Sequence, residues 1–91
     1  MKPLKKYSYV ASGKFVKNWS RLDSQTQKSV VGKIDLFLEN PYLPSLKTHK
    51  LSGKLNDFWS FSVSYSLRIL FQFSKNSIVE FIDIGGHEIY K

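Results

Sequence analysis

The second half of the chain contains an alternation of large apolar residues with serines, and this pattern limits the folds available to it. Between residues 59 and 66, every second position is apolar or aromatic: Trp59, Phe61, Val63 and Tyr65. Successive side chains of a β-strand point to opposite faces of a sheet, so this pattern predicts a strand with one packed face and one small, polar face. Two more apolar runs, at residues 67–73 and 78–84, flank a turn-like segment, Ser74–Ser77. We therefore expect an antiparallel meander in this half.

The first half has a different period. After a strand-like stretch at residues 7–10, apolar residues recur twice at helical spacing, within residues 13–22 and again within residues 24–39. Ser24 and Gln27 match a capping box for the second helix, and Asn40-Pro41 ends it, because the residue before proline is disfavoured in a helix. The two helices are expected to form a hairpin joined near Asp23.

These segments predict an α+β fold: an N-terminal strand, a two-helix hairpin, and an antiparallel β-meander whose one face carries the helices. With 91 residues, the chain is too short to build two independent cores, so residues 1–91 are expected to form one domain.

The composition argues against several classes of site. There is no cysteine, and the two histidines lie far apart in the chain, so we expect no metal site and no cofactor. No apolar run reaches the roughly 18 residues that indicate a membrane span, and no signal-type segment follows the charged start. We expect a cytoplasmic protein that does not bind membranes.

The charge is strongly basic and unevenly distributed. The formal net charge is +7, and the residues up to Lys33 hold eight cations against a single acid, Asp23. Such an asymmetry favours a polyanionic or acidic protein partner, although a lysine-rich face that only keeps the protein soluble has the same composition. Between Pro41 and Leu55 the chain is also basic, with four residues that can hold a phosphate backbone or simply line a solvated loop: Lys47, His49, Lys50 and Lys54.

Three residues near the end of the chain have side chains suited to chemistry. Arg68 lies within an apolar strand, where its guanidinium fits either a phosphate or an ion pair with Glu80 or Asp83. His87 follows Gly85-Gly86 and carries the side chain most often used as a general acid or base, although a surface histidine in a loose tail is the simpler alternative. Tyr90 can stack on a base, donate its hydroxyl to a phosphate, or pack the tail onto the sheet.

The order of these motifs resembles the RelE/ParE superfamily of bacterial type II toxins, and most of all its RelE and YafQ-like mRNA interferases. The resemblance covers essentially the whole chain. It is carried by four segments in sequence order: Leu51-Ser52-Gly53-Lys54-Leu55, Phe58-Trp59-Ser60-Phe61-Ser62-Val63, Tyr65-Ser66-Leu67-Arg68-Ile69-Leu70-Phe71 and Asp83-Ile84-Gly85-Gly86-His87-Glu88-Ile89-Tyr90.

The resemblance implies a ribosome-dependent endoribonuclease that cuts mRNA in the ribosomal A site and is neutralised by an acidic antitoxin, with which it forms a hetero-oligomer. It implies that Arg68 contacts the scissile phosphate, that His87 is an acid or base, and that Tyr90 is functional. His49 matches an auxiliary histidine, and Lys50 and Lys54 partly match a lysine cluster. Where the YafQ-like pattern has an arginine shortly before the terminal histidine, this chain has Asp83.

The reaction expected from this resemblance is metal-independent cleavage by the ribose 2′-hydroxyl, with His87 as base or acid, Arg68 as the charge stabiliser and Tyr90 or Lys54 as a positioning or proton-donating group. Two alternatives remain at this stage. One is a non-catalytic member that acts by binding, as a ParE-like gyrase inhibitor or an inert antitoxin partner. The other is a plain RNA-binding module. In either toxin reading, Lys14, Lys17 and Arg21 are expected to face ribosomal RNA or an acidic antitoxin helix.

Overall fold

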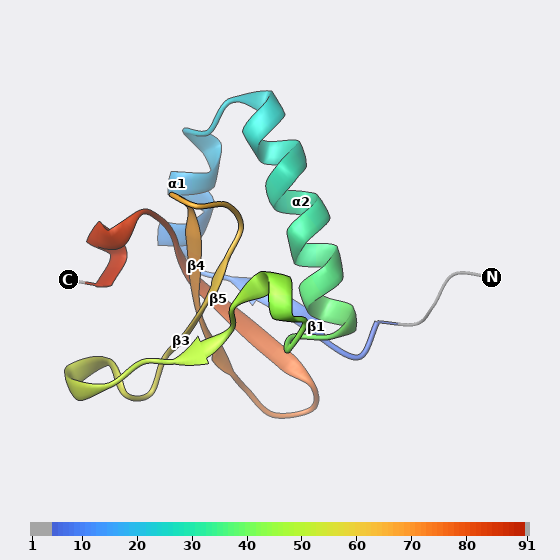
Figure 1. Cartoon of the computed structure of the whole chain (residues 1–91), viewed down its shortest axis with the longest axis vertical. Coiled ribbons are helices and arrows are strands. Elements are labelled where there is room, and N and C mark those ends of the chain that lie inside the picture. The colour runs from blue at the N-terminus through green and yellow to red at the C-terminus, as the bar shows by residue number, and fades with distance from the viewer. Residues whose placement is uncertain (1–4, 91) are drawn as a thin grey trace.

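The computed structural model describes residues 5–90, and Lys2, one of the cations counted above, lies outside this range. The elements in chain order are β1 (Ser8–Ala11), α1 (Gly13–Ser20), α2 (Ser24–Glu39), the 3-10 turn η1 (Pro44–Leu46), β2 (His49–Lys50), the 3-10 turn η2 (Gly53–Leu55), β3 (Trp59–Ser62), β4 (Arg68–Phe73), β5 (Ile78–Gly85) and the 3-10 turn η3 (His87–Tyr90). Figure 1 shows the two helices as a hairpin packed beside a twisted sheet. The predicted α+β architecture is confirmed.

The five strands form one mixed sheet in the order β1-β5-β4-β3-β2. The meander from β3 to β5 is antiparallel, as predicted, whereas β1 pairs with β5 in parallel and forms one edge. The other edge is β2, a two-residue strand in the segment that the sequence indicated only as a basic connection. The parallel pairing is possible because the whole α1–α2 hairpin and the meander separate β1 from its partner in the chain.

Each helix begins at a side-chain cap. The Ser12 hydroxyl accepts a hydrogen bond from the Phe15 N–H at 3.0 Å, and the Asp23 carboxylate accepts one from the Thr26 N–H at 2.7 Å. The expected Ser24 cap is therefore wrong by one residue. Asp23 and Ser24 are both good capping residues, and the structure uses the charged one, whose pKa is lowered by the Thr26 N–H.

The core lies between the helices and one sheet face, and aromatic rings fill it. Phe37 of α2 is fully buried and stacks on Phe61 of β3, with ring centroids 4.1 Å apart. The next two strands, β4 and β5, contribute Phe71 and Phe81. The Phe37 ring meets the Phe71 ring edge-on, with ring centroids 4.7 Å apart. Phe61 was predicted to be a packing residue, and this is confirmed. Trp59 is partly buried against the same cluster.

The predicted strand alternation ends earlier than the sequence pattern does. β3 stops at Ser62, and Ser64 to Ser66 form a loop in which Tyr65 is 97% exposed. The expectation that Tyr65 belongs to the packed face is therefore wrong. The Leu67 carbonyl accepts the Val63 N–H at 2.8 Å, which closes the hairpin before the alternation can continue.

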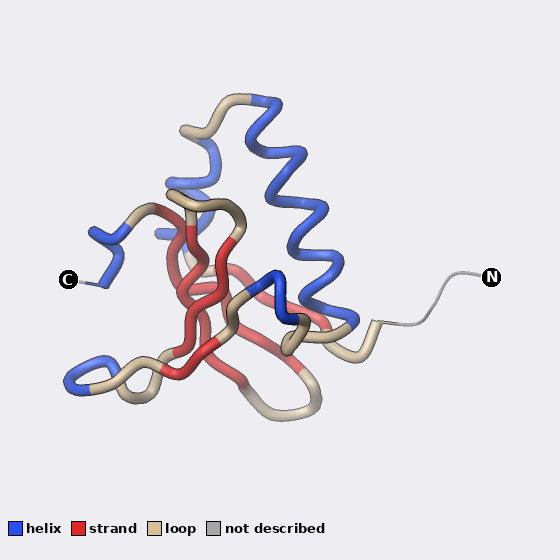
Figure 2. Tube along the Cα trace, viewed as in Figure 1, coloured by secondary structure: helices blue, strands red, loops and turns tan. Residues whose placement is uncertain are grey.

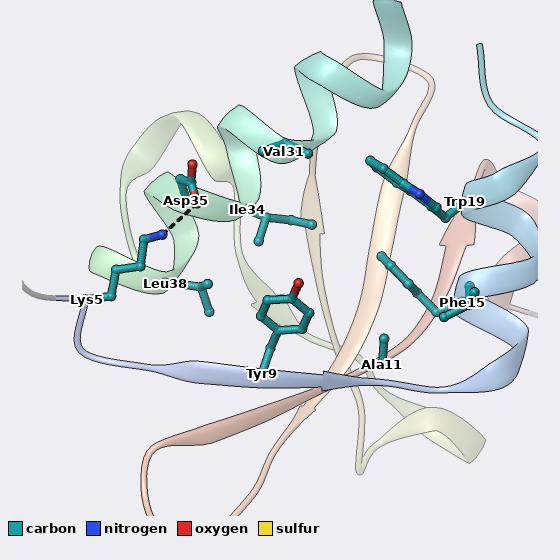
Figure 3. Close-up of a pocket in the computed structure, with 10 residues that line it drawn as sticks. Lys5, Tyr9, Ala11, Phe15, Trp19, Val31, Ile34, Asp35 and Leu38 are labelled. Carbon is teal, nitrogen blue, oxygen red and sulfur yellow. Dashed lines mark hydrogen bonds and ion pairs between the residues drawn. The ribbon is translucent and has the colours of Figure 1, made fainter. Parts of the chain in front are cut away.

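A groove lies between β1, α1 and α2, with a volume of about 490 Å³. Figure 3 shows its floor and walls: Tyr9 on the strand, Phe15 and Trp19 on α1, and Val31 on α2, with the Lys5–Asp35 ion pair at one end. Val31 and Tyr9 are each about half exposed there. Among the described residues, no helix is both long enough and apolar enough to cross a membrane.

Candidate active site on the open face of the sheet

The face of the sheet that points away from the core carries the predicted site. Paired residues of neighbouring antiparallel strands share a face, and the core residue Phe61 pairs with Ile69. The alternate pairs, Ser60 with Leu70 and Ser62 with Arg68, therefore occupy the opposite face, which we call the open face. The register also places His49 beside Ser60 on this face. The predicted small, polar face is present at Ser60 and Ser62.

After β5 the chain forms a single turn, η3 (Figure 2), whose Tyr90 contacts Ser60 on the open face. Ile89 of this turn is 6% exposed, so its side chain anchors the turn, whereas His87 remains exposed. The buried Ile89 side chain therefore holds η3 against the rest of the domain.

Arg68 and His87 are in direct contact. The Arg68 guanidinium donates to His87 Nε2 across 3.3 Å. Because a guanidinium can only donate, Nε2 is the acceptor in this hydrogen bond. Among the described residues, Arg68 makes no ion pair with Glu80 or Asp83, the two carboxylates that the sequence offered as its partners. The arginine fork therefore lies beside a ring nitrogen of His87 on the open face.

Tyr90 is the third member of this cluster, and it contacts both Ser60 and His87. Its hydroxyl is 2.7 Å from the Ser60 hydroxyl, and its ring meets the His87 imidazole edge-on with centroids 6.0 Å apart. Ser60 is 1% exposed, so this hydrogen bond satisfies a buried hydroxyl and fixes the tyrosine. The open face therefore gathers a guanidinium, an imidazole and a phenol.

Gly85 and Gly86 are needed here because a side chain at either position would collide with η3. Neither has a positive φ. A Cβ added at Gly85 would lie 2.7 Å from Ile89 Cγ2 and 2.8 Å from Glu88 Oε1, and one at Gly86 would lie 2.7 Å from Glu88 Oε2. The glycines allow the last turn to lie against the strand that it leaves.

Asp83, which stands where the family pattern has an arginine, makes its contacts with α1. Its carboxylate accepts from Asn18 Nδ2 at 2.7 Å and from the Ile84 N–H at 2.8 Å, and it lies 3.4 Å from Lys14 Nζ. It is 3% exposed. Asp83 thus connects β5 to α1, and Lys14 forms an ion pair with it.

The four basic-segment residues are spread over different places. Lys47 lines a hollow that Arg68 also lines. His49 lies on the open face, and its Nδ1 donates to the Lys47 carbonyl at 2.9 Å. Lys50 pairs with Trp59 and so belongs to the opposite face of β2, and Lys54 lies on η2, which projects from the sheet edge in Figure 1. Lys47 and His49 therefore lie near Arg68 or on its face of the sheet, whereas Lys50 and Lys54 lie elsewhere.

The same hollow is also lined by Lys33 and Tyr65, which sequence reasoning did not select as site residues. A signal for Tyr65 was available, because a lone aromatic residue between two serines directly precedes the Arg68 strand. Among the described residues, no group of three or more His, Asp or Glu side chains is arranged to hold a metal ion.

No protein-family model matches this sequence, and no curated protein matches it in a sequence comparison. Solved structures do match the fold. The RelBE2 toxin–antitoxin complex from Mycobacterium tuberculosis is similar with a TM-score of 0.75 and 14% identity, over 89% of this chain and 98% of that one. A YoeB/ParE toxin from Agrobacterium tumefaciens has a TM-score of 0.74 and 19% identity, over 88% and 98%.

The YafQ structures extend the likeness to the branch that the sequence motifs resembled. In the DinJ–YafQ toxin–antitoxin complex from E. coli, the similar chain has a TM-score of 0.72 and 17% identity, over 92% of this chain and 96% of that one. About nine-tenths of this chain is thus superimposable on structures of this group. The chain has the fold of the RelE, ParE and YafQ toxins.

Proposed function

We propose that this protein is the toxin of a type II toxin–antitoxin pair and that it cleaves mRNA on the ribosome. The observation that carries the proposal is the Arg68–His87 contact of 3.3 Å on the open face, with the Tyr90 hydroxyl fixed beside it by Ser60. A fold alone hosts several activities, so the argument for catalysis depends on this cluster.

The proposed reaction is an internal transfer at phosphorus. The ribose 2′-oxygen attacks the neighbouring phosphate and loses its proton to a base, while the bond from phosphorus to the 5′-oxygen breaks and that oxygen takes up a proton. The products are a 2′,3′-cyclic phosphate and a 5′-hydroxyl. The step requires a base, a cation for the charge on the phosphorane oxygens, and an acid.

The cluster offers a group for each requirement. His87 presents the lone pair of Nε2 and is suited to accept the 2′-hydroxyl proton once the phosphate takes over the Arg68 fork. Arg68 can hold two phosphate oxygens in a bidentate manner. Tyr90 has a hydroxyl that can donate to the leaving oxygen or position the phosphate, and His49 lies on the same face beside Ser60.

The partner that fits the groove between β1, α1 and α2 is an acidic antitoxin segment with an apolar face. The M. tuberculosis and E. coli structures are toxin–antitoxin complexes. In this chain the groove has half-exposed apolar walls, and Lys28 lines an adjoining hollow with Trp19 and Val31. Replacing Lys17 of α1 and Arg21, the residue directly after α1, by glutamate should weaken antitoxin binding or ribosome binding. Lys14 is left in place because it pairs with Asp83.

The direct test is primer extension on ribosome-bound mRNA with wild type and His87→Ala. His87 is exposed, so the variant should fold normally, and cleavage should fall by about 10²- to 10⁴-fold, the usual contribution of one acid or base. Equal cleavage and equal growth arrest by the variant would refute the assignment.

Expressing the protein in cells distinguishes this proposal from the alternative in which it acts only by binding. A gyrase inhibitor would cause DNA damage before translation stops, whereas an mRNA interferase would stop translation first. Asp83 stands where the family pattern has an arginine, and its contacts with Asn18 and Lys14 give this carboxylate a structural role outside the site.

A further inference from the structure

A basic hollow lies beside the Arg68–His87 cluster, where the loop between β3 and β4 meets η1 and α2. Its volume is about 330 Å³, and its lining includes three cations, Lys33, Lys47 and Arg68, and no acidic residue. Three other lining residues are serines. Cations and hydroxyls without a competing carboxylate favour an anionic ligand with several oxygen atoms, such as a phosphodiester.

Tyr65 forms part of the same lining, and packing does not explain it. Its side chain is 97% exposed, although the other tyrosines of the described residues are more covered. The loop that carries it is short and closed, because the Leu67 carbonyl accepts from the N–H groups of Val63 at 2.8 Å and Ser64 at 3.2 Å. A flat ring held on such a loop offers a stacking surface at a small entropic cost.

The loop also touches the tail that carries His87. A Cβ built on Gly86 would lie 3.4 Å from the Ser66 carbonyl oxygen, so the two segments are in close contact. In Figure 1 this loop and the C-terminal turn lie near the same end of the sheet, where Arg68 pairs with Gly85. Arg68 belongs both to the hollow and to the contact with His87. A chain of nucleotides held at Arg68 would therefore continue directly into the hollow.

We propose that this hollow binds the nucleotide next to the scissile phosphate, with Lys33 and Lys47 on its phosphate and Tyr65 stacked on its base. The proposal rests on the proposed function in that it takes single-stranded RNA as the ligand. The hollow would be a binding site for one nucleotide, separate from the groups that react. Tyr65 is a binding residue in this account and takes no part in the proton transfers.

The chemistry favours RNA over an acidic peptide. A peptide carboxylate would use the cations but would leave the Tyr65 ring without a planar partner, whereas every nucleobase has a face on which an aromatic ring can stack. Stacking of this kind changes affinity by roughly 5- to 100-fold per base, and each phosphate contact by a lysine adds a salt-dependent contribution.

The experiment measures equilibrium binding at low salt by fluorescence anisotropy. The ligands are a six-nucleotide 2′-O-methyl RNA, which cannot be cleaved by 2′-attack, an abasic chain of the same length, and poly-glutamate. The proteins are wild type, Tyr65→Ala, Tyr65→Phe, Lys33→Gln and Lys47→Gln. Lys75→Gln is the matched control, because Lys75 is an exposed lysine in the turn at the opposite end of β4.

We expect Tyr65→Ala to weaken binding of the base-bearing RNA by roughly 5- to 100-fold and to leave the abasic chain unaffected, while Tyr65→Phe binds like wild type. Lys33→Gln and Lys47→Gln should each reduce the slope of log affinity against log salt by about 0.7, and Lys75→Gln should not. Circular dichroism checks that the folds are the same.

Several results would overturn the subsite: undetectable binding of the RNA by wild type, equal affinity of Tyr65→Ala and wild type, or an unchanged salt slope in both lysine variants. Poly-glutamate binding that depends equally on Tyr65 would reassign the hollow to an acidic protein. The proposed function fails separately, because it depends on cleavage and on His87. Tyr65-dependent binding without cleavage would keep the subsite and refute the interferase.

Discussion

The two faces of the β3–β4–β5 sheet use alternate residues of the same strands in opposite ways. On the face toward the helices, Phe61 and Phe71 are completely buried and surround Phe37 of α2. On the open face lie Ser60, Ser62, Leu70 and Arg68, and η3 reaches this face through the Tyr90–Ser60 hydrogen bond. Stability is concentrated on one face and reactive groups on the other.

The difference shows how a chain of 91 residues accommodates a polar site. A strand has a period of two, so a residue change on one face leaves the packing of the other largely intact. The core can then be optimised for packing while the open face keeps exposed polar groups. Substitutions on the two faces should therefore separate stability from cleavage.

The largest effect is expected on the helix face, from Phe37→Ala. This change removes a fully buried ring that stacks on Phe61, and such changes cost about 3–5 kcal/mol. Domains of this size are stable by only about 5–15 kcal/mol, so a large part of the stability is lost. Urea unfolding followed by circular dichroism measures it.

The matched control is Leu36→Ala, at the neighbouring position of α2, where the side chain is 40% exposed. It should change the free energy of unfolding by less than about 0.5 kcal/mol. Similar losses for the two variants would mean that the ring cluster is not the centre of stability.

A smaller effect on stability and a clear one on cleavage is expected from Gly85→Ala. The new Cβ would lie 2.7 Å from Ile89 Cγ2, so η3 must move and carry His87 with it. Misplacing a reacting group by about 1 Å costs on the order of 10²-fold in rate, and overpacking costs about 1–3 kcal/mol. Single-turnover cleavage and urea unfolding measure the two quantities.

Gly32→Ala is the control for this substitution. A Cβ at Gly32 meets nothing within 4 Å, and the residue lies inside α2. The variant should cleave like wild type and be more stable by about 0.5–1 kcal/mol, because alanine favours the helix. Loss of cleavage in both glycine variants would contradict the prediction, because it would show that cleavage is lost without a collision between residue 85 and η3.

The smallest effect is expected at the N-terminus of α2, away from both faces. The pKa of Asp23 is lowered by the hydrogen bond from the Thr26 N–H, so its charge stabilises the folded state above the ordinary carboxyl pKa, and this contribution is lost as the pH falls through the lowered value. Asp23→Asn keeps a capping oxygen and removes the charge.

Thermal unfolding of Asp23→Asn and wild type at several pH values checks this sign. The variant should melt slightly lower at neutral pH, and the difference should shrink as the pH falls into the acid range. A difference that grows in acid would contradict the assigned pKa direction. Cleavage at neutral pH should be unchanged.

The sequence predicts a large part of this fold, because the relevant signals are local. The helical spacing around Phe15 and Phe37 and the period of two from Trp59 identify the elements and their packed faces. The parallel pairing of β1 with β5 was not predictable in this way, because it joins residues about 70 positions apart and no local pattern specifies it.

The candidate residues of the site could be selected from the sequence, whereas their geometry could not. The residue types and their order indicated Arg68, His87 and Tyr90, and the structure brings them together. Tyr65 was misassigned because the alternation continues past the point where backbone hydrogen bonds close the loop. At Asp83, the register shifts so that Leu70 pairs with Asp83 and Phe71 with Phe81, and a bulge of this kind breaks the simple alternation along β5.

The central claim is that Arg68 and His87 act together on one phosphate. It is tested most directly by single-turnover cleavage of ribosome-bound mRNA with His87→Gln, Arg68→Gln and the double variant. Each single change should slow cleavage by at least about 10²-fold, and the double variant should be less than about 10-fold slower than the slower single variant, because groups that act as a unit are not additive. Wild-type rates in either single variant, or a double loss equal to the product of the two single losses, would contradict the account.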